Sequence, residues 1–422
     1  MRITTRTYLQ IITTAAIAVF INACGDTVME ENINSDENID TMLCVGDYQT
    51  PEQAEKQLSK FASTYGNVKE WEERAKIVRA GFIEGAKLGQ IPDSFRKAAF
   101  NPIIGKTHKM NGYTVSNIAI VGMPGHYITG NLYKPEDIKG KVPIVLCAHG
   151  HGFSPDDYGR FRPAEQKRAA ALAKMGAVAF AYDMIGFGEN SSFKHTEPNA
   201  LQIQTFNSMR LLDYLCSLDY TDSTKIGITG SSGGGTQSLY LSVVDKRVSV
   251  IVPVVMTSSY FFGGCICESG MPVHKSQTHE TNNVDLAALF APKPALFISD
   301  GHDWTAHFPE IGFPYLKNVY KLYHADENVE NVHLPDEYHD YGISKRKAAY
   351  KFLAKHLGLD YTAILDENGE VNEDFIRLIH TQDLKVFPDK PIVFMSGWSY
   401  EWSDVYVQKI EALKERGSKI DK

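Results

Sequence analysis

The sequence lacks the features of several protein classes. No run of basic residues interleaved with aromatic residues occurs anywhere in the chain, and the formal net charge is −8. A nucleic-acid-binding surface needs such a basic stripe, so we expect no nucleic-acid partner. Internal repeats and low-complexity tracts are also missing. The hydrophobic content of 43% and the charged content of 22% are those of an ordinary globular protein with a sizeable core.

Cysteine is scarce, with six residues in a chain of 422. Cys147 lies in an apolar run and Cys216 on an apolar helix face, so both are expected to be small buried hydrophobic residues. Cys265 and Cys267 are too close for an easy disulfide, and no second pair or nearby histidine spacing forms a zinc motif. We therefore predict no disulfide scaffold, no metal site and no cofactor.

No apolar run is long enough to be a clear membrane span, and the apolar run near the amino terminus is short. Residues 11–21 follow a cationic start, are too few to span a bilayer comfortably, and end just before Ala23 and Cys24. This pattern resembles a bacterial lipoprotein signal over residues 1–24, in which Cys24 becomes the lipid-modified first residue. Residues 25–45 are polar and acidic and predict a flexible tether. We expect a cell-envelope protein that meets the membrane through its lipid anchor only. A secretory signal that releases the chain to the periplasm is the alternative.

The rest of the chain alternates between apolar strands and amphipathic helices. This pattern predicts an α/β domain over residues 111–358, with a mostly parallel sheet covered by helices on both faces. Residues 112–133 predict an antiparallel hairpin before it. A helical extension is expected over 46–110, and a tail without assigned chemistry over 359–422. Further strands are expected at 143–148, 177–182, 225–229, 248–255, 295–299 and 328–334, and helices at 163–174, 201–218, 236–244 and 345–357.

The most informative stretch is Gly230-Ser231-Ser232-Gly233-Gly234, directly after the apolar run 226–229. It predicts a strand that turns abruptly into a helix with Ser232 at the apex. A serine hydroxyl lifted clear of a sheet needs a strained backbone and no side chains beside it, which the flanking glycines provide. A plain turn that opens a helix is the alternative for the five residues alone.

Two further residues complete a catalytic set in chain order. Open α/β sheets bind ligands beyond the carboxyl ends of their strands, and Ser232, an aspartate and His339 each follow a predicted strand. Such a serine needs a histidine to remove its proton and a carboxylate to orient that histidine. Asp303 is preferred as the acid, because Gly301 lets the chain turn back toward the histidine. Asp300 and Glu268 stay open as alternatives; Glu268 lies in a long insertion over 256–283 that is expected to be functional.

An oxyanion hole needs two backbone N–H groups directed at the developing negative charge. Gly233 supplies one at the start of the helix. The other is expected from the loop after the strand 143–148, which reads His149-Gly150-His151-Gly152. A histidine pair of this kind could instead bind a metal, but no carboxylate spaced to complete such a site is evident.

Together these motifs resemble the α/β-hydrolase superfamily, and within it bacterial carbohydrate esterases of the acetyl-xylan-esterase and glucuronoyl-esterase-like kind. The resemblance covers roughly residues 71–357. It implies the α/β-hydrolase fold and serine-dependent hydrolysis of esters on plant polysaccharides or their fragments. In that comparison Ser232 matches the nucleophile, His339 the base, and His151 with Gly233 the oxyanion donors.

The resemblance leaves the ester itself open. Glucuronoyl esterases usually carry a basic residue just after the serine, where this chain has glycines, so removal of acetyl groups is favoured over cleavage of a glucuronoyl or methyl uronate ester. A prolyl-oligopeptidase-type peptidase shares the order of catalytic residues, but the N-terminal part is too short for its propeller. A surface-binding lipoprotein with a vestigial site is the third alternative.

Overall fold

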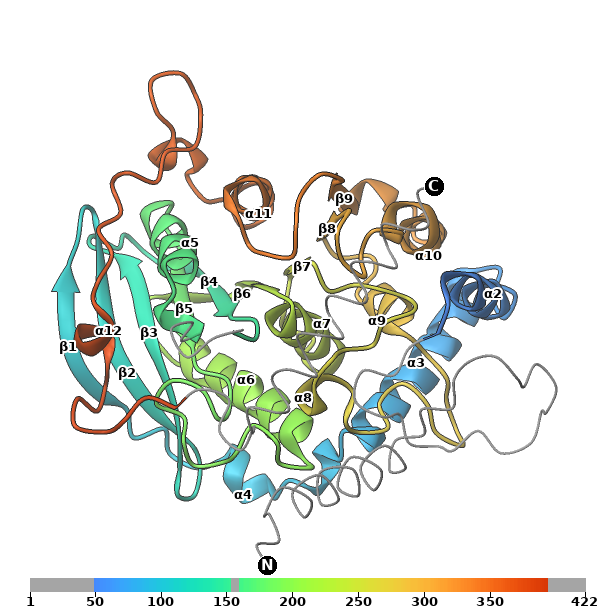
Figure 1. The fold of residues 1–422 in the computed structure, drawn as a ribbon, viewed down its shortest axis with the longest axis horizontal. Helices are drawn as coiled ribbons and strands as arrows, with labels where there is room; N and C mark the ends of the chain where they lie inside the picture. Colours follow the sequence, from blue (N-terminus) through green and yellow to red (C-terminus); the bar gives the residue numbers. More distant parts are fainter. Residues whose placement is uncertain (1–48, 153–158, 394–422) are drawn as a thin grey trace, which may run out of the picture.

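A nine-stranded sheet forms the centre of the protein (Figure 1). The computed structural model describes residues 49–152 and 159–393, and within this part the strand order is β1-β2-β3-β5-β4-β6-β7-β8-β9. The strands are β1 (Ile103–Lys109), β2 (Tyr113–Met123), β3 (His126–Pro135), β4 (Val142–Ala148), β5 (Val178–Tyr182), β6 (Thr221–Ser231), β7 (Val250–Val254), β8 (Ala295–Asp300) and β9 (Val329–Leu334).

The pairing confirms the predicted fold class. Strands β5, β4, β6, β7, β8 and β9 run parallel, whereas β1, β2 and β3 form an antiparallel edge that joins β5. The hairpin of β2 and β3 was expected, but strand β1 was not. Its side chains are almost all exposed, so the strand shows no alternation of apolar and polar residues that could reveal it in the sequence.

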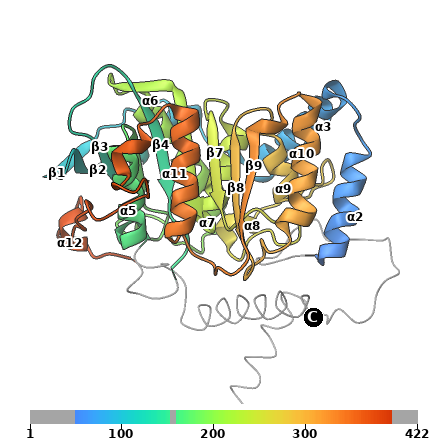
Figure 2. The same ribbon diagram turned by 90° about the horizontal axis from the view of Figure 1, so that it is seen from above.

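Helices cover both faces of the sheet, each over its own apolar core (Figure 2). Helices α5 and α11 lie on one face, and α3, α6, α7, α9 and α10 lie on the other. Successive side chains of β4 alternate between the two cores, as a strand buried on both faces requires. The helices are α2 (Pro51–Ala62), α3 (Val68–Gly85), α4 (Asp93–Arg96), α5 (Pro163–Lys174), α6 (Ala200–Cys216), α7 (Gly233–Val244), α8 (Ile266–Ser269), α9 (Asn283–Ala288), α10 (Phe313–Leu322), α11 (Ile343–Leu357) and α12 (Thr381–Leu384).

The N-terminal extension, expected to be helical over 46–110, begins with the helices α2 and α3 but ends in strand β1. Thr50 caps α2 by accepting a hydrogen bond from the backbone N–H of Gln53, and Asn67 caps α3 in the same way through Glu70. Both helices pack on the apolar core at one face of the sheet through buried residues, with Trp71 and Phe82 contributing the largest side chains. The extension is therefore part of the same packed body as the sheet.

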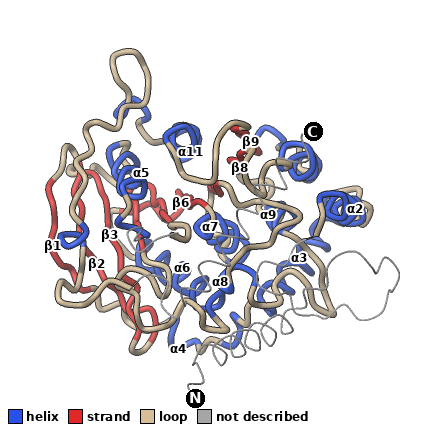
Figure 3. Tube along the Cα trace, in the orientation of Figure 1, coloured by secondary structure: helices blue, strands red, loops and turns tan. Residues whose placement is uncertain are grey.

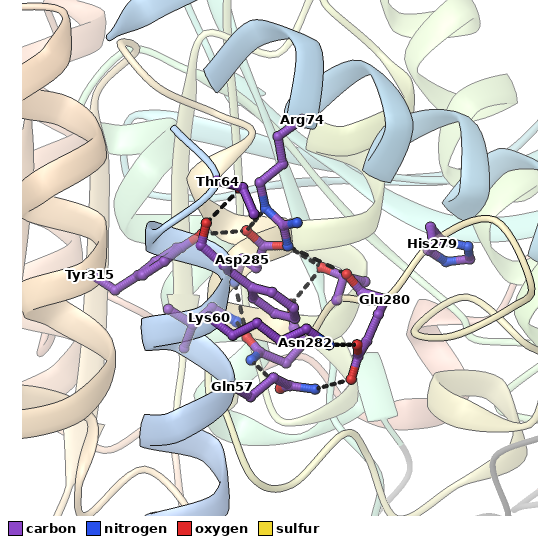
Figure 4. A network of polar contacts seen from close by, with 12 residues as sticks. Gln57, Lys60, Thr64, Arg74, His279, Glu280, Asn282, Asp285 and Tyr315 are labelled. Carbon is purple, nitrogen blue, oxygen red and sulfur yellow. Dashed lines mark hydrogen bonds and ion pairs between the residues drawn. The ribbon is translucent and has the colours of Figure 1, made fainter. Parts of the chain in front are cut away.

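Polar contacts fasten this extension to helix α9 and to the insertion that precedes it (Figure 4). The Arg74 guanidinium lies 2.6 Å from Oδ2 of Asp285, and the other carboxylate oxygen, Oδ1, accepts a hydrogen bond from the Tyr315 hydroxyl. Lys60 forms a 2.9 Å ion pair with Glu280 at the more exposed end of the network. The insertion spans 256–283 and is mostly loop around the short helix α8 (Figure 3). These contacts give an irregular segment a fixed position.

The segment after α11 packs against the antiparallel edge of the sheet, where no role was assigned to it from the sequence. Asn117 donates hydrogen bonds to the backbone carbonyls of Asp383 and Lys385, both at 2.8 Å. Arg160 is fully buried, forms ion pairs with Asp183 and Glu189, and donates to the Leu384 carbonyl. Removing either partner of such a buried ion pair would leave an uncompensated charge in the interior. This network therefore fixes both the segment after α11 and the loop after β5.

Several predictions fall on residues that the structure does not describe. The signal over 1–24 with Cys24, the tether over 25–45 and the end of the tail beyond residue 393 lie outside the described residues. Among the residues that are described, no helix is long and apolar enough to span a bilayer.

Candidate active site

Ser232 lies at the apex of a sharp turn between β6 and α7, as the sequence predicts. Its backbone adopts φ 54° and ψ −125°, a left-handed conformation that a residue with a side chain rarely adopts. The turn is held by hydrogen bonds from the Ser232 N–H to the Val254 carbonyl at 3.0 Å and from the Thr236 N–H to the Ser232 carbonyl at 2.9 Å. This is the geometry of a nucleophile elbow.

The glycines of the motif are required by the close approach of strand and helix. A Cβ at Gly230 would lie 2.5 Å from the Ala148 carbonyl oxygen, and one at Gly234 would lie 2.4 Å from the same oxygen. Both contacts are with backbone atoms, which cannot move aside cheaply. The spacing of the motif therefore follows from the packing of β4 against the elbow.

Asp303 and His339 are brought together across 36 residues of sequence. His339 Nδ1 lies 2.6 Å from Asp303 Oδ2, and both side chains are almost fully buried. The second carboxylate oxygen, Oδ1, accepts hydrogen bonds from both the backbone N–H and the hydroxyl of Thr305, each at 2.6 Å. The carboxylate is thus fixed on one side, and its other oxygen can orient the imidazole.

The two alternative acids have other partners. Asp300 lies at the end of β8, and its Oδ2 is 3.2 Å from the buried ammonium of Lys345. Burial and the nearby Asp303 raise the pKa of Asp300, which Lys345 opposes. Glu268 accepts a hydrogen bond from the Thr236 hydroxyl at 2.9 Å. The structure therefore pairs the histidine with Asp303, the acid preferred from the sequence.

The loop that carries His339 is held from both sides. Trp304 packs against the imidazole with ring centroids 4.5 Å apart, and Phe261 packs against the same indole at 4.4 Å. Lys345 binds the carbonyl of Tyr338 at 2.5 Å and the carboxylate of Asp340 at 2.9 Å. Both neighbours of the histidine in the chain are thus tied to α11, which limits the freedom of the imidazole.

The loop after β4 packs directly on the elbow, in the position expected of an oxyanion loop. A Cβ at Gly150 would lie 2.7 Å from the Ser231 carbonyl oxygen and 3.0 Å from the Ser232 Cβ. The His151 ring lies so close to Gly233 that a Cβ there would be 2.7 Å from Cε1. His151 and Gly233, the two predicted donors, are therefore neighbours at the amino end of α7.

The two histidines of this loop have different surroundings. His149 Nε2 accepts a hydrogen bond from the Met184 N–H at 3.0 Å, so its ring supports the loop after β5. The His151 ring instead meets His195, Cys265 and Cys267. All four side chains are buried, and their ligand-type atoms lie within 4.8 Å of one another.

This grouping was not anticipated from the sequence. The sequence offered no histidine spaced to complete a set with Cys265 and Cys267, yet the fold assembles such a set among the described residues. His195 was missed because it lies 70 residues from Cys265 and in a loop without periodicity. A short Cys-x-Cys sequence was the available signal, and its partners come from loops that only the sheet topology places beside it.

The arrangement of Ser232, His339 and Asp303 provides the groups for acyl transfer. A hydroxyl at a strained turn can attack a carbonyl, an oriented imidazole can move the proton, and backbone N–H groups at a helix start can bind the resulting oxyanion. The three residues follow the carboxyl ends of strands β6, β8 and β9, which are parallel and therefore end at the same edge of the sheet.

Comparison with known proteins supports the fold and finds esterases among the proteins of similar structure. The structure is similar to that of the methylesterase BT1017, with a TM-score of 0.74 and 36% sequence identity over 87% of this chain and 82% of that one. A glucuronoyl esterase from Teredinibacter turnerae T7901 shares the fold at a TM-score of 0.54 and 14% identity, covering 82% of this chain and 99% of that one.

The sequence relatives are more distant. The protein YcjY of Escherichia coli (strain K12) is 29% identical over 159 residues, which cover 36% of this chain and 46% of that protein. The protein YtaP of Bacillus subtilis (strain 168) is 24% identical over 192 residues, covering 40% of this chain and 63% of that protein. This chain thus matches less than two thirds of the length of either relative. No protein-family model matches the chain.

Proposed function

Since the chain belongs to the α/β-hydrolase carbohydrate esterases, we propose that it is a serine esterase that cleaves a methyl ester on an acidic sugar. The hydrogen bond between His339 and Asp303, together with the strained turn at Ser232, supports the proposal of a serine mechanism. The substrate proposal rests on the similarity to a methylesterase at 36% identity.

The proposed reaction proceeds in two halves. Ser232 Oγ attacks the ester carbonyl while His339 Nε2 accepts the hydroxyl proton, and the backbone N–H groups of Gly233 and His151 bind the oxyanion. The tetrahedral intermediate collapses, the C–O bond to the alcohol breaks, and His339 returns the proton to the leaving alkoxide. A water molecule, deprotonated by His339, then hydrolyses the acyl-enzyme and regenerates Ser232.

The methyl ester changes the order of preference reached from the sequence. A methyl carboxylate ester on a carbohydrate can form only at a sugar carboxyl group, so a methylesterase that acts on a carbohydrate needs a sugar acid, such as a uronate, as its substrate. The solved acetyl xylan and glucuronoyl esterases with TM-scores above 0.5 share 17% identity or less with this chain, so their likeness supports the fold alone. The methyl ester, earlier the alternative, thus becomes the first candidate.

Acetyl esters are the second candidate, because one feature favours them. Three glycines, Gly233 to Gly235, occupy the positions just after the nucleophile, and no cation follows Ser232 there to hold a uronate. In an acetylated sugar the sugar is the alcohol part of the ester and carries no carboxylate, so its binding needs no cation after Ser232.

Paired substrates distinguish the candidates. Methanol release from a methyl-esterified uronic-acid oligosaccharide is compared with acetate release from an acetylated xylo-oligosaccharide, and Ser232→Ala serves as the control. The proposal expects methanol as the favoured product and a loss of about 10⁶-fold in kcat for the variant. Acetate as the favoured product would select the second candidate. A Ser232→Ala activity within about tenfold of the wild type would refute the serine mechanism. Preference for a peptide p-nitroanilide would indicate a peptidase.

The location is proposed from the amino terminus, which lies outside the described residues. The cationic start, the short apolar stretch and Cys24 support a lipid-anchored protein of the cell envelope. The acyl chains would hold the enzyme at a membrane surface, since each buried CH₂ adds about 0.8 kcal/mol.

A further inference from the structure

Four buried side chains meet beside the oxyanion loop. His151 Nε2 lies 3.1 Å from His195 Nε2 and 3.2 Å from Cys267 Sγ, and His195 Nε2 lies 3.1 Å from Cys265 Sγ. None of the four residues is more than 2% exposed. Two imidazole nitrogens and two sulfurs thus converge on one point in the interior.

The orientation of one histidine is set for ligation. His195 Nδ1 lies 2.7 Å from the backbone carbonyl of Ile185, an acceptor that can bind only a protonated nitrogen. A neutral imidazole with its proton on Nδ1 presents a lone pair at Nε2, the atom that faces the cluster. Metal-binding histidines are commonly oriented in this way by a carbonyl or carboxylate partner.

The spacing fits a tetrahedral centre. Zinc bonds of about 2.0 Å to nitrogen and 2.3 Å to sulfur imply distances of roughly 3.3–3.8 Å between ligand atoms. The three separations given above, of 3.1, 3.1 and 3.2 Å, are a few tenths of an ångström shorter, and all four atoms lie within 4.8 Å of one another. Small side-chain rotations would therefore open the cluster around an ion.

The donor set selects the metal and its role. Two thiolates with two imidazoles in a tetrahedral arrangement favour Zn²⁺ over the oxygen-seeking cations Mg²⁺ and Ca²⁺. Two thiolates also neutralise the charge of the ion in a buried site. Four protein ligands fill a tetrahedron and leave no position for water or substrate, which is the pattern of a structural site.

We propose that His151, His195, Cys265 and Cys267 bind one structural Zn²⁺ ion. The ion would join three segments that are distant in sequence: the oxyanion loop after β4, the loop after β5, and the insertion after β7 at the start of its helix α8. Through the His151 imidazole it would fix the loop that packs on Gly233 and Ser232. The site does not depend on which ester is cleaved.

A disulfide between the two cysteines is the competing arrangement. Only Ile266 separates Cys265 from Cys267, and a bridge across so short a span is strained. Both cysteines also direct their sulfur toward histidine nitrogens, at 3.1 and 3.2 Å. A count of free thiols on protein denatured in a chelator separates the two arrangements. If Cys265 and Cys267 form a disulfide, neither is counted, whereas if they bind zinc, the chelator removes the ion and both are counted.

The test measures bound metal in the full chain, without recourse to activity. Protein purified and dialysed free of loose metal should contain about one zinc per chain, as four protein ligands require. Cys267→Ala and His195→Ala should each retain at least about tenfold less. Cys216→Ser, a half-buried cysteine outside the cluster, is the matched control and should keep its zinc. Unchanged zinc in both cluster variants, or no zinc in the wild type after Zn²⁺ is offered, would overturn the proposal.

Two measurements keep the test decisive if the variants do not fold. X-ray absorption on the wild type should show zinc–sulfur distances near 2.3 Å with two sulfur neighbours. Thiolate-to-metal charge transfer should appear when Co²⁺ replaces zinc. Oxygen-only coordination would refute the site. Ser232→Ala should lose esterase activity while it keeps its zinc, so failure of the metal proposal and failure of the serine mechanism give different results.

Discussion

Replacing Asp303 by asparagine tests the proposed catalytic set most directly. The substitution preserves shape, and the surroundings decide how the new amide is placed. Both the N–H and the hydroxyl of Thr305 donate to Oδ1 at 2.6 Å, so the asparagine oxygen must occupy that position. The NH₂ group is then left facing His339 Nδ1, where the carboxylate oxygen stands at 2.6 Å in the wild type.

This placement predicts the wrong tautomer of the catalytic histidine. An NH₂ group can only donate, so Nδ1 of His339 becomes the acceptor and the proton moves to Nε2. An imidazole protonated at Nε2 cannot accept the proton of Ser232. The expected loss in kcat is about 10⁴-fold, which corresponds to roughly 5.5 kcal/mol of transition-state stabilisation. The fold should persist, because the Thr305 contacts remain.

The assay is hydrolysis of p-nitrophenyl acetate, followed together with the thermal unfolding midpoint. Asp300→Asn and Glu268→Gln are the matched controls, since both acids are buried nearby but pair with Lys345 and Thr236 instead. Each control that folds should keep kcat within about tenfold. If Asp303→Asn keeps more than about a tenth of the activity while either control loses it, the reasoning is refuted and the role of the acid passes to that residue.

Three further predictions concern stability and location. Arg74→Met should lower the free energy of unfolding by about 3 kcal/mol, because it leaves the buried carboxylate of Asp285 without its cation. Lys60→Met, at the exposed end of the same network, should lower it by less than about 1 kcal/mol. Equal urea midpoints for the two variants would contradict this prediction. Burial lowers the pKa of both His126 and His274 to about 4, so as the pH falls below 6.5 the unfolded chain binds protons before the folded protein does. The free energy of unfolding should therefore fall between pH 6.5 and 4, by up to about 1.4 kcal/mol per pH unit for each histidine. A free energy of urea unfolding that does not change over this pH range would contradict the prediction. We propose that Cys24→Ser abolishes incorporation of a fatty-acid analogue and releases the protein from membranes; labelling that persists in the variant would contradict lipidation at this residue.

Local features of this chain could be predicted from the sequence, because short-range sterics determine them. The elbow at Ser232 needs glycines where strand and helix cross, and the structure places backbone atoms 2.5 Å or less from a Cβ at Gly230 or Gly234. The order of strands and helices follows from their periodicity, and parallel strands bring their carboxyl ends to one edge. The proximity of Asp303 and His339 could therefore be anticipated, as could the preference for Asp303 over Asp300, which rests on the turn at Gly301.

Other features required the tertiary structure, because they depend on contacts between distant segments. The cluster of His151, His195, Cys265 and Cys267 joins residues 44, 70 and 116 positions apart, and no spacing rule connects His195 with Cys265. Strand β1 carries no apolar alternation, since its side chains face solvent. The segment around Leu384 has a polar sequence, yet buried Asn117 and Arg160 bind its backbone carbonyls. Backbone groups bind without regard to side-chain identity, so the sequence of that segment carries no signal of where it packs.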